Sequence, residues 1–399
     1  MNRRNFMKNT LCGFSLLPSK NLAERMLNVP QKENLYPLDS RRRIRELGIR
    51  IGTLEPGPYN AITDVEGVRV GHTTIIKGED RGAVRTGVTV ILPHCGNIYE
   101  QNLFASYFNL NGWGEMTGMA AVEETGKLKT PIFLTGTYNV GIVYSAVINY
   151  LSKINPNIGN AAQTVNPVVA ECFDDFLSDT QSRQISEEDV LMAIEKAKSG
   201  AVVEGAVGGG TGMTSFGFKG GIGTSSRKVS DKYIVGVLVM ANTGSRDQLR
   251  IDGVPIGKEI RGFKYKYGKT RSIILVAATD APLLPYQLKK ISKRAAIGLA
   301  QTGAISHTGS GDILLAFSTA NKIPMNKPAS FQNIKAINDF WITPLYQAAV
   351  EATHEAVINA LTAARTTVGR NNNTAFGIPL DQVKKIMKKY LRIGEKNYE

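Results

Sequence analysis

The sequence predicts an α/β fold built as one large domain, and three observations carry this prediction. Short apolar stretches rich in β-branched residues alternate along the chain with segments that repeat apolar residues at helical spacing. Residues 130–141 predict a strand that ends in a glycine-bearing turn, and residues 142–154 predict the helix that follows it. No repeat of fixed period and no long low-complexity linker divides the 399 residues. We therefore expect strands and helices packed around a shared core.

The expected elements follow one another from about Ile44 to the C-terminus. Strands are predicted where β-branched and apolar residues run together or alternate: residues 67–76, 86–93, 130–141, 232–242, 271–279 and 312–321. Helices are predicted where apolar residues recur every three or four positions: residues 142–154, 160–179, 186–200, 287–303 and 342–366. For residues 160–179 we expect a helix or a segment that contains one.

Two of these regions carry local signals of their own. Ser186 offers a hydroxyl to cap a helix, Asp189 is the acid at the third helical position, and Gly200 is a stop signal. Residues 205–226, "GAVGGGTGMTSFGFKGGIGTSS", are dense in glycine instead. There we expect tight turns at which strands approach each other or a substrate closely.

Composition and charge exclude several classes of protein. Hydrophobic residues make up 42% and charged residues 21%, which is typical of globular chains, and no apolar run reaches the roughly 18 residues of a membrane span. The net charge of +14 favours a solvated basic face over nucleic-acid binding, because no zinc spacing, RNP-like run or long basic helix accompanies it. The three cysteines and four histidines lack metal-site spacing, so each histidine is expected on the surface or in the core: Cys12, Cys95, Cys172, His72, His94, His307 and His354.

The N-terminus predicts export. "MNRRNFMKNTLCGFSLLP" places two arginines before a short semi-apolar stretch, as a twin-arginine signal does. We expect residues 1–30 to be an export signal and flexible lead-in, and residues 40–399 to be a single catalytic domain. The expected location is periplasmic, and a cytoplasmic protein with a disordered tail is the alternative.

Two familiar kinds of active site do not fit the sequence. The glycine-rich stretch lacks the GK[ST] of a P-loop and the GxGxxG of a dinucleotide site between a strand and a helix. A Ser-His-Asp hydrolase of the α/β type would show GxSxG, which does not occur, and none of the histidines has a suggestive context.

Ser272 is left as a candidate nucleophile, at the start of an expected buried strand. A serine hydroxyl needs an adjacent base, and a chain can supply one as its own terminal amine. If the bond between Arg271 and Ser272 were cut, Ser272 would carry both groups, and an amine of pKa about 7.7 to 8.0 has a useful neutral fraction near neutral pH. On the residues alone, a serine that simply opens a strand is the commoner interpretation.

A resemblance favours the catalytic interpretation. From Ile44 almost to the C-terminus the chain resembles the DmpA family of L-aminopeptidase/D-esterases and β-peptidyl aminopeptidases. The matching motifs include "GPYNAITDVEGVRVGHTTI", "PVVAEC", "GAVGGGTGM", "FKGGIGTSSR", "VGVLVMANTG", "SIILVAATDAPLLPYQLKK" and "SGDILLAFSTAN". The resemblance implies a precursor that cuts itself before one serine into two chains that stay together. It also implies a four-layer αββα sandwich, of the type shared with ornithine acetyltransferase-like self-processing enzymes, and a homo-oligomer of processed heterodimers.

The resemblance also assigns residues. It places the nucleophile at Ser272, a second serine and a carboxylate at Ser310 and Asp312, and an oxyanion-hole asparagine at Asn242. These roles agree with chemistry: an amide N–H placed where negative charge develops stabilises a tetrahedral intermediate, and a hydroxyl with a carboxylate can orient an amine and relay protons.

The substrate's free ammonium needs an anion at a fixed distance from the scissile carbonyl. Glu171 is our candidate for that anion, with Phe173 as a wall of the same pocket, and a helix acid on the surface is the equally favoured alternative for Glu171. One departure concerns the cleavage site: the family usually has glycine before the nucleophile, and this chain has Arg271. Because glycine tolerates a strained backbone better, we expect arginine to slow maturation.

The sequence therefore predicts a self-processed serine aminopeptidase or amidase. It would act on short peptides, amides or esters that carry a free amino group, with no metal or organic cofactor and no nucleic-acid partner. Two alternatives stay open: an unprocessed homologue that only binds, and an acyltransferase that uses the same nucleophile. The motifs do not decide between α-, β- and D-configured substrates.

Overall fold

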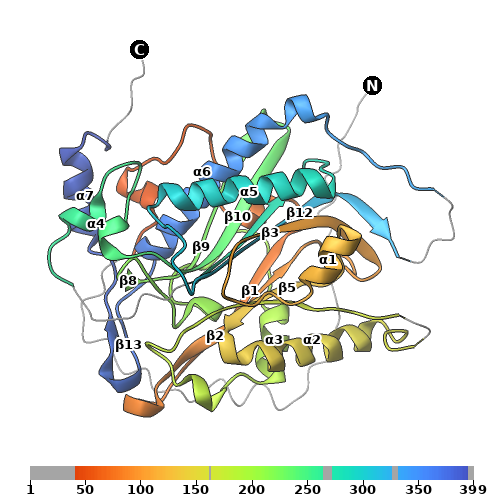
Figure 1. The fold of residues 1–399 in the computed structure, drawn as a ribbon, viewed down its shortest axis with the longest axis horizontal. Coiled ribbons are helices and arrows are strands. Elements are labelled where there is room, and N and C mark those ends of the chain that lie inside the picture. The colour runs from red at the N-terminus through yellow and green to blue at the C-terminus, as the bar shows by residue number, and fades with distance from the viewer. Residues whose placement is uncertain (1–40, 161–162, 264–271, 326–330, 394–399) are drawn as a thin grey trace, which may run out of the picture. The chain divides into compact units, whose positions relative to one another are not determined.

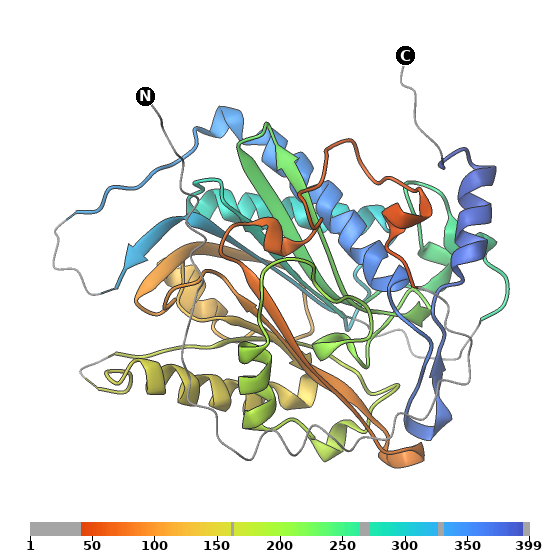
Figure 2. The same ribbon diagram turned by 180° about the vertical axis from the view of Figure 1, so that it is seen from behind.

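The computed structural model describes residues 41–160, 163–263, 272–325 and 331–393. These residues belong to one compact unit, Arg41–Glu399. Two sheets lie face to face within it, and each carries helices on its outer face (Figures 1 and 2). Within the described ranges, no helix is both long and apolar enough to cross a bilayer.

The larger sheet has six strands in the order β4-β3-β12-β11-β10-β9. Their bounds are Lys127–Leu128, Gln101–Gly112, Gly311–Pro324, Ser272–Thr279, Tyr233–Asn242 and Gly221–Val229. β11 and β12 are parallel, and the long helix α5, Pro285–Gln301, connects them, whereas the other pairs in this sheet are antiparallel. α5 and α6, Thr343–Thr362, cover the outer face of this sheet (Figure 1).

The smaller sheet has four strands in the order β1-β2-β5-β6. Their bounds are Arg69–Lys77, Val84–Leu92, Ile132–Gly136 and Val168–Cys172. β5 and β6 are parallel and are connected through α2, Val140–Ile154, which together with α3, Glu187–Glu195, covers the outer face (Figure 1). The shorter elements are α1 Met119–Thr125, α4 Ile256–Glu259, α7 Leu380–Lys389, β7 Thr214–Ser215, β8 Phe218–Lys219, β13 Thr367–Val368 and β14 Thr374–Ala375.

Three apolar cores separate these four layers, and β11 shows how one strand serves two of them. Its side chains alternate between the sheet's faces, as a strand requires. Ile273, Leu275 and Ala277 join the core under α5 and α6, and Ile274 and Val276 join the core between the sheets. Burial on both faces explains why residues 273–278 are an unbroken apolar run. The expected αββα sandwich is confirmed.

The predicted elements agree with the structure except at two places. Residues 160–179 contain no helix among those described: Val168–Cys172 form β6, buried along its whole length. A short apolar run has no periodicity that separates a buried strand from a buried helix. The helix at 186–200 has its predicted cap, with Asp189 N–H donating to Ser186 Oγ, but it ends at Glu195, before Gly200.

Candidate active site

The candidate site lies where the central strands of the larger sheet end. Ser272 is the first residue of β11 and stands directly opposite Asn242, the last residue of β10. Directly opposite residues share a face of a sheet. The next residues on that face, Met240 and Ile274, belong to the core between the sheets, so Ser272 and Asn242 also face this layer.

Ser272 is held by its parallel neighbour β12. The side chain is buried, and its Oγ accepts a hydrogen bond of 3.0 Å from the backbone N–H of Gly311. Asp312, the next residue, stands level with Ile273 in the parallel register. The α5 crossover thus brings residues about forty positions apart in the sequence to the same end of the sheet.

Ser310 and Asp312 form a pair beside the nucleophile. Ser310 Oγ donates a hydrogen bond of 2.7 Å to Asp312 Oδ1, and both residues are buried. Burial raises the pKa of Asp312 above its ordinary value, against the hydrogen bonds from the hydroxyls of Ser310 and Ser306, the bond from the Ile273 backbone, and the charge of His307. A buried carboxyl with a raised pKa takes up a proton more readily than an exposed aspartate does.

Hydrogen bonds fix the Asn242 amide at both ends, and its Oδ1 also accepts a longer bond of 3.5 Å from the Thr214 hydroxyl. Its Oδ1 accepts from the backbone N–H of Thr214 at 2.9 Å, and its Nδ2 donates to the Phe173 carbonyl at 2.9 Å. A primary amide carries two N–H donors, so one further donor remains for an oxygen at the reacting centre. These bonds restrain the amide plane, as an oxyanion donor requires.

Glu171 comes from the other sheet, on β6. It is 5% exposed, so it is a buried strand residue and the alternative of a surface helix acid is wrong. Its carboxylate accepts hydrogen bonds from the Glu115 backbone N–H at 2.9 Å and from the Thr137 hydroxyl. Burial raises the pKa of Glu171, and these two bonds oppose the rise.

Two glycines connect Glu171 to the nucleophile's surroundings. A Cβ atom on Gly114 would lie 2.9 Å from the Cα of Gly311 and 3.2 Å from Glu171 Oε1. Gly311 is the residue whose N–H binds Ser272, so the absence of side chains lets the carboxylate approach the reacting end of β11.

Exposed aromatic residues adjoin this group through backbone contacts. Phe173 is 36% exposed and meets Tyr138 edge to face, with ring centroids 5.6 Å apart. Trp113 is 73% exposed, and its backbone N–H donates to the Ser310 carbonyl at 3.2 Å. Large exposed apolar rings beside buried polar groups are typical of ligand sites.

The structure brings all six predicted side chains to this end of the molecule: Ser272, Ser310, Asp312, Asn242, Glu171 and Phe173. Arg271, on the other side of the predicted cut, lies outside the described residues. Sequence reasoning missed the groups that hold the site, namely Gly311, Thr214 and Thr137. Gly311 could have been found from its place between Ser310 and Asp312 in "GSGD", whereas no sequence pattern marks Thr214 or Thr137.

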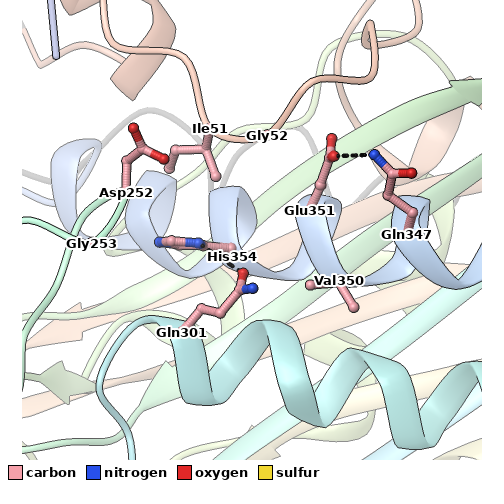
Figure 3. A pocket seen from close by; sticks show the side chains of 9 residues that line it. All are labelled: Ile51, Gly52, Asp252, Gly253, Gln301, Gln347, Val350, Glu351 and His354. Carbon is pink, nitrogen blue, oxygen red and sulfur yellow. Dashed lines mark hydrogen bonds between the residues drawn. The ribbon is translucent and has the colours of Figure 1, made fainter.

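A separate pocket of about 610 Å³ lies beside α6 (Figure 3). Its walls come from Ile51–Gly52, the turn at Asp252–Gly253, the end of α5 and one face of α6. None of the six candidate residues lines it. Its volume therefore does not make it the place of the chemistry.

Comparison with known proteins identifies the family. The model of peptidase family S58 matches residues 60–375. The chain belongs to peptidase family S58. Beta-peptidyl aminopeptidase BapA of Sphingosinicella xenopeptidilytica is 44% identical to this S58 chain over 369 residues, covering 87% of the chain and 91% of BapA.

Two solved structures show the same arrangement as this S58 member. A Burkholderia sp. beta-aminopeptidase superposes with a TM-score of 0.82 at 40% identity and covers 87% of this chain and 99% of its own. The L-aminopeptidase D-Ala-esterase/amidase from Ochrobactrum anthropi, described as a prototype for the serine aminopeptidases and a variant of the Ntn hydrolase fold, gives 0.82 at 38% identity, covering 88% and 99%. The predicted family, fold and serine aminopeptidase activity are confirmed. The roles of the individual residues stay predictions.

Proposed function

We propose that the S58 chain is cut between Arg271 and Ser272 and that the new N-terminal serine is the nucleophile. The observation that carries this proposal is the group at the head of β11: Ser272 Oγ receives the Gly311 N–H at 3.0 Å, and Asn242 stands directly opposite. The freed α-amine of Ser272 takes the hydroxyl proton as Oγ attacks the substrate carbonyl. Asn242 Nδ2 donates to the developing oxyanion.

The same α-amine then serves both the formation and the breakdown of the acyl-enzyme. The α-ammonium returns its proton to the departing amine as the carbon–nitrogen bond breaks, and water attacks the ester at Ser272 Oγ with the amine again as base. Asp312 and Ser310, joined at 2.7 Å, orient the α-amine and hold the positive charge that it acquires. Water adds across the bond, so the products are an amino acid and the shortened peptide or amine.

Glu171 fixes which end of a peptide enters. In this proposal its carboxylate binds the substrate's ammonium, and the hydrogen bonds from Thr137 and the Glu115 backbone hold it in place. Burial raises the pKa of Glu171 although its hydroxyl and amide donors oppose the rise, and a bound ammonium would favour the ionised form. The rings of Phe173, Tyr138 and Trp113 would cover the substrate's side chain and leaving group.

We propose short peptides with an N-terminal β-amino acid as the first substrates to test. The support is the similarity over most of the chain to proteins named for β-peptidyl aminopeptidase and β-aminopeptidase activity. The same carboxylate would accept the ammonium of an α-amino acid, so β-alanyl and α-alanyl anilides should be compared at equal concentration.

We further propose a periplasmic homo-oligomer. The paired arginines near the N-terminus support export, although residues 1–40 lie outside the described part of the chain.

Three aromatic residues support assembly into an oligomer, because Phe331, Phe340 and Trp341 are 76%, 92% and 76% exposed. Exposed rings at this density are typical of protein interfaces. N-terminal sequencing of the periplasmic fraction and light scattering of the purified protein test the two parts.

The decisive experiment measures cutting and hydrolysis together. Wild type should separate under denaturing conditions into two chains, the smaller being residues 272–399 with Ser272 at its N-terminus by mass spectrometry. Ser272→Ala should stay intact and lose activity by about 10⁵-fold or more, as removal of a covalent nucleophile does. Ser152→Ala, on α2 in the far layer, should match wild type.

Two other results would contradict the proposal. An active, intact Ser272→Ala protein would remove Ser272 from the reaction. A wild type that stays intact and inactive would support the non-catalytic binding homologue instead.

A further inference from the structure

The glycine-rich stretch contains a buried lysine that the reaction described above does not use. β7 and β8 form a hairpin whose two turn residues, Phe216 and Gly217, have φ angles of 48° and 70°. Positive φ at both central positions is the signature of the type I′ turn that two-residue hairpins favour. This register places Lys219 directly opposite Thr214.

Lys219 is fully buried, with 0% exposure. Its Nζ donates three hydrogen bonds, to the carbonyls of Gly210 at 3.1 Å, Met213 at 2.6 Å and Gly220 at 2.9 Å. An ammonium has three N–H donors, and all three are used, whereas a neutral amine could donate to only two of these carbonyls. Lysine is almost never buried without such partners.

A single peptide group connects this ammonium to the candidate oxyanion donor. The carbonyl of Met213 receives the 2.6 Å bond from Lys219, and the N–H of the same peptide, that of Thr214, donates to Asn242 Oδ1 at 2.9 Å. Asn242 stands opposite Ser272 in the sheet. Hydrogen bonds in series polarise one another, so charge on Lys219 strengthens the Thr214 donor and, through the Asn242 amide, the Nδ2 donor.

We propose that Lys219 is a positioning residue of the oxyanion site, acting on Asn242 through the Met213–Thr214 peptide. This inference rests on the proposed function, because it assumes that Asn242 stabilises the oxyanion. Asp174, buried against Gly212 of the glycine-rich stretch, has a carboxyl whose charge favours the ammonium, although burial raises its own pKa to about 7. Burial lowers the pKa of Lys219 to about 7, and the charge of Asp174 opposes this.

Kinetics distinguish a Lys219 that positions Asn242 from a Lys219 that only stabilises the fold. The oxyanion is absent from the bound substrate and develops only in the transition state and the tetrahedral intermediate, so loss of its stabilisation lowers kcat and leaves KM nearly unchanged. Removal of a direct oxyanion donor typically costs about 10²- to 10³-fold in kcat, and an indirect effect through one peptide should be smaller, about 10- to 100-fold.

The test is a double-mutant cycle between Lys219→Met and Asn242→Ala, measured on the cut fraction of full-length protein. We expect Lys219→Met to lower kcat about 10- to 100-fold with KM within about twofold of wild type, and to have no further effect in the Asn242→Ala background. Lys219→Arg, which keeps the charge, should recover part of the loss. Lys228→Met is the matched control, because Lys228 is exposed on β9.

Several results would overturn the inference. The first is a wild-type kcat in Lys219→Met. The second is a double variant whose fold-loss in kcat equals the product of the losses in Lys219→Met and Asn242→Ala. The third is the absence of a cooperative unfolding transition in both Lys219→Met and Lys219→Arg. If Lys219→Met is not fully cut, the same cycle applies to the rate of cutting in freshly translated chain, with the same expected non-additivity. Failure of the proposed function is separate, because it would already appear as an uncut or inactive wild type.

Discussion

Two buried clusters of charged residues in this enzyme hold their carboxylates in different ways. On the outer side of the larger sheet, Arg227 of β9 lies between two glutamates of α6, with bonds of 3.1 Å to Glu351 and 2.8 Å to Glu355, and Arg45 adds a bond of 2.9 Å to Glu355. At the head of β11, Asp312 receives a serine hydroxyl instead of a guanidinium.

The pKa directions follow from these partners. Burial acts to raise the pKa of Glu351, but the hydrogen bonds from Gln347 and the residue 53–54 backbone, together with the charge of Arg227, hold it below its ordinary value. Burial raises the pKa of Asp312, and its hydroxyl and amide partners do not reverse this. Neutral donors together with Arg227 therefore outweigh burial at Glu351, whereas burial outweighs the donors at Asp312, so Asp312 takes up a proton more readily. This difference separates a structural cluster from a reactive one.

The strongest way to break this comparison is Asp312→Asn. The amide keeps the shape but cannot hold the positive charge of the α-amine, so we expect kcat to fall by about 10²- to 10⁴-fold. Because the fold disfavours the ionised form of Asp312, removal of the charge should leave the unfolding free energy unchanged or higher at neutral pH. Steady-state kinetics and urea unfolding on the same preparation measure both effects. A variant that loses stability together with activity would place Asp312 among the structural carboxylates.

Arg227→Met should give the opposite pattern. It leaves Glu351 and Glu355 buried without their shared cation, and breakage of a buried pair costs about 3 to 5 kcal/mol of unfolding free energy. The folded fraction should keep the wild-type kcat, because these residues line none of the candidate site. Urea unfolding measures the loss, and the double variant Arg227→Met with Glu355→Gln should recover part of it. If the double variant recovers none of the lost unfolding free energy, the Arg227–Glu355 pair does not account for the loss of stability.

The contrast also explains how far the sequence could predict this enzyme. Strands such as residues 273–278 and the helix capped by Ser186 carry their own patterns, so the α/β class and the order of these elements could be predicted, whereas the αββα layers were implied by the resemblance. Ser272 and Asp312 were placed by resemblance, not by physics, since neither spacing nor composition shows that α5 returns the chain to the same strand end. Lys219 and Thr137 could not be predicted, because their partners are backbone carbonyls or a carboxylate distant in sequence.

The pH dependence of the unfolding free energy tests α6, the helix that carries the structural cluster. Burial lowers the pKa of His354, on α6, to about 4, against opposing charges of Asp252 and Glu355. Between about pH 4 and 6.5 the unfolded chain binds more protons at this site than the folded one, so the unfolding free energy falls as the pH falls. The loss at about pH 5 should be about 2 kcal/mol relative to neutral pH.

His354→Gln isolates this contribution. Urea unfolding at neutral pH and at about pH 5 should show a smaller difference in the variant than in wild type. The pH profile of kcat should not change, because His354 lines the pocket beside α6 (Figure 3), and none of the six candidate site residues lines that pocket. An equal pH dependence of unfolding in both proteins would mean that other groups carry the acid sensitivity.

The smallest expected effect concerns Arg271, the residue before the cut. Arg227 acts in the structural cluster through its charge, and the question is whether Arg271 affects the cutting rate through its charge or through its backbone. Attack of Ser272 Oγ on the carbonyl of residue 271 requires a backbone conformation that glycine adopts at lower cost than arginine. Strain of about 1 kcal/mol corresponds to roughly a fivefold change in rate, so Arg271→Gly should be cut about that much faster. Pulse labelling and gel electrophoresis follow the rate, and Arg271→Met is the control that removes charge alone. The cut enzyme should have the wild-type kcat in both variants, since residue 271 then belongs to the other chain's end. Faster cutting in Arg271→Met that equals that of Arg271→Gly would assign the effect to charge and not to backbone freedom.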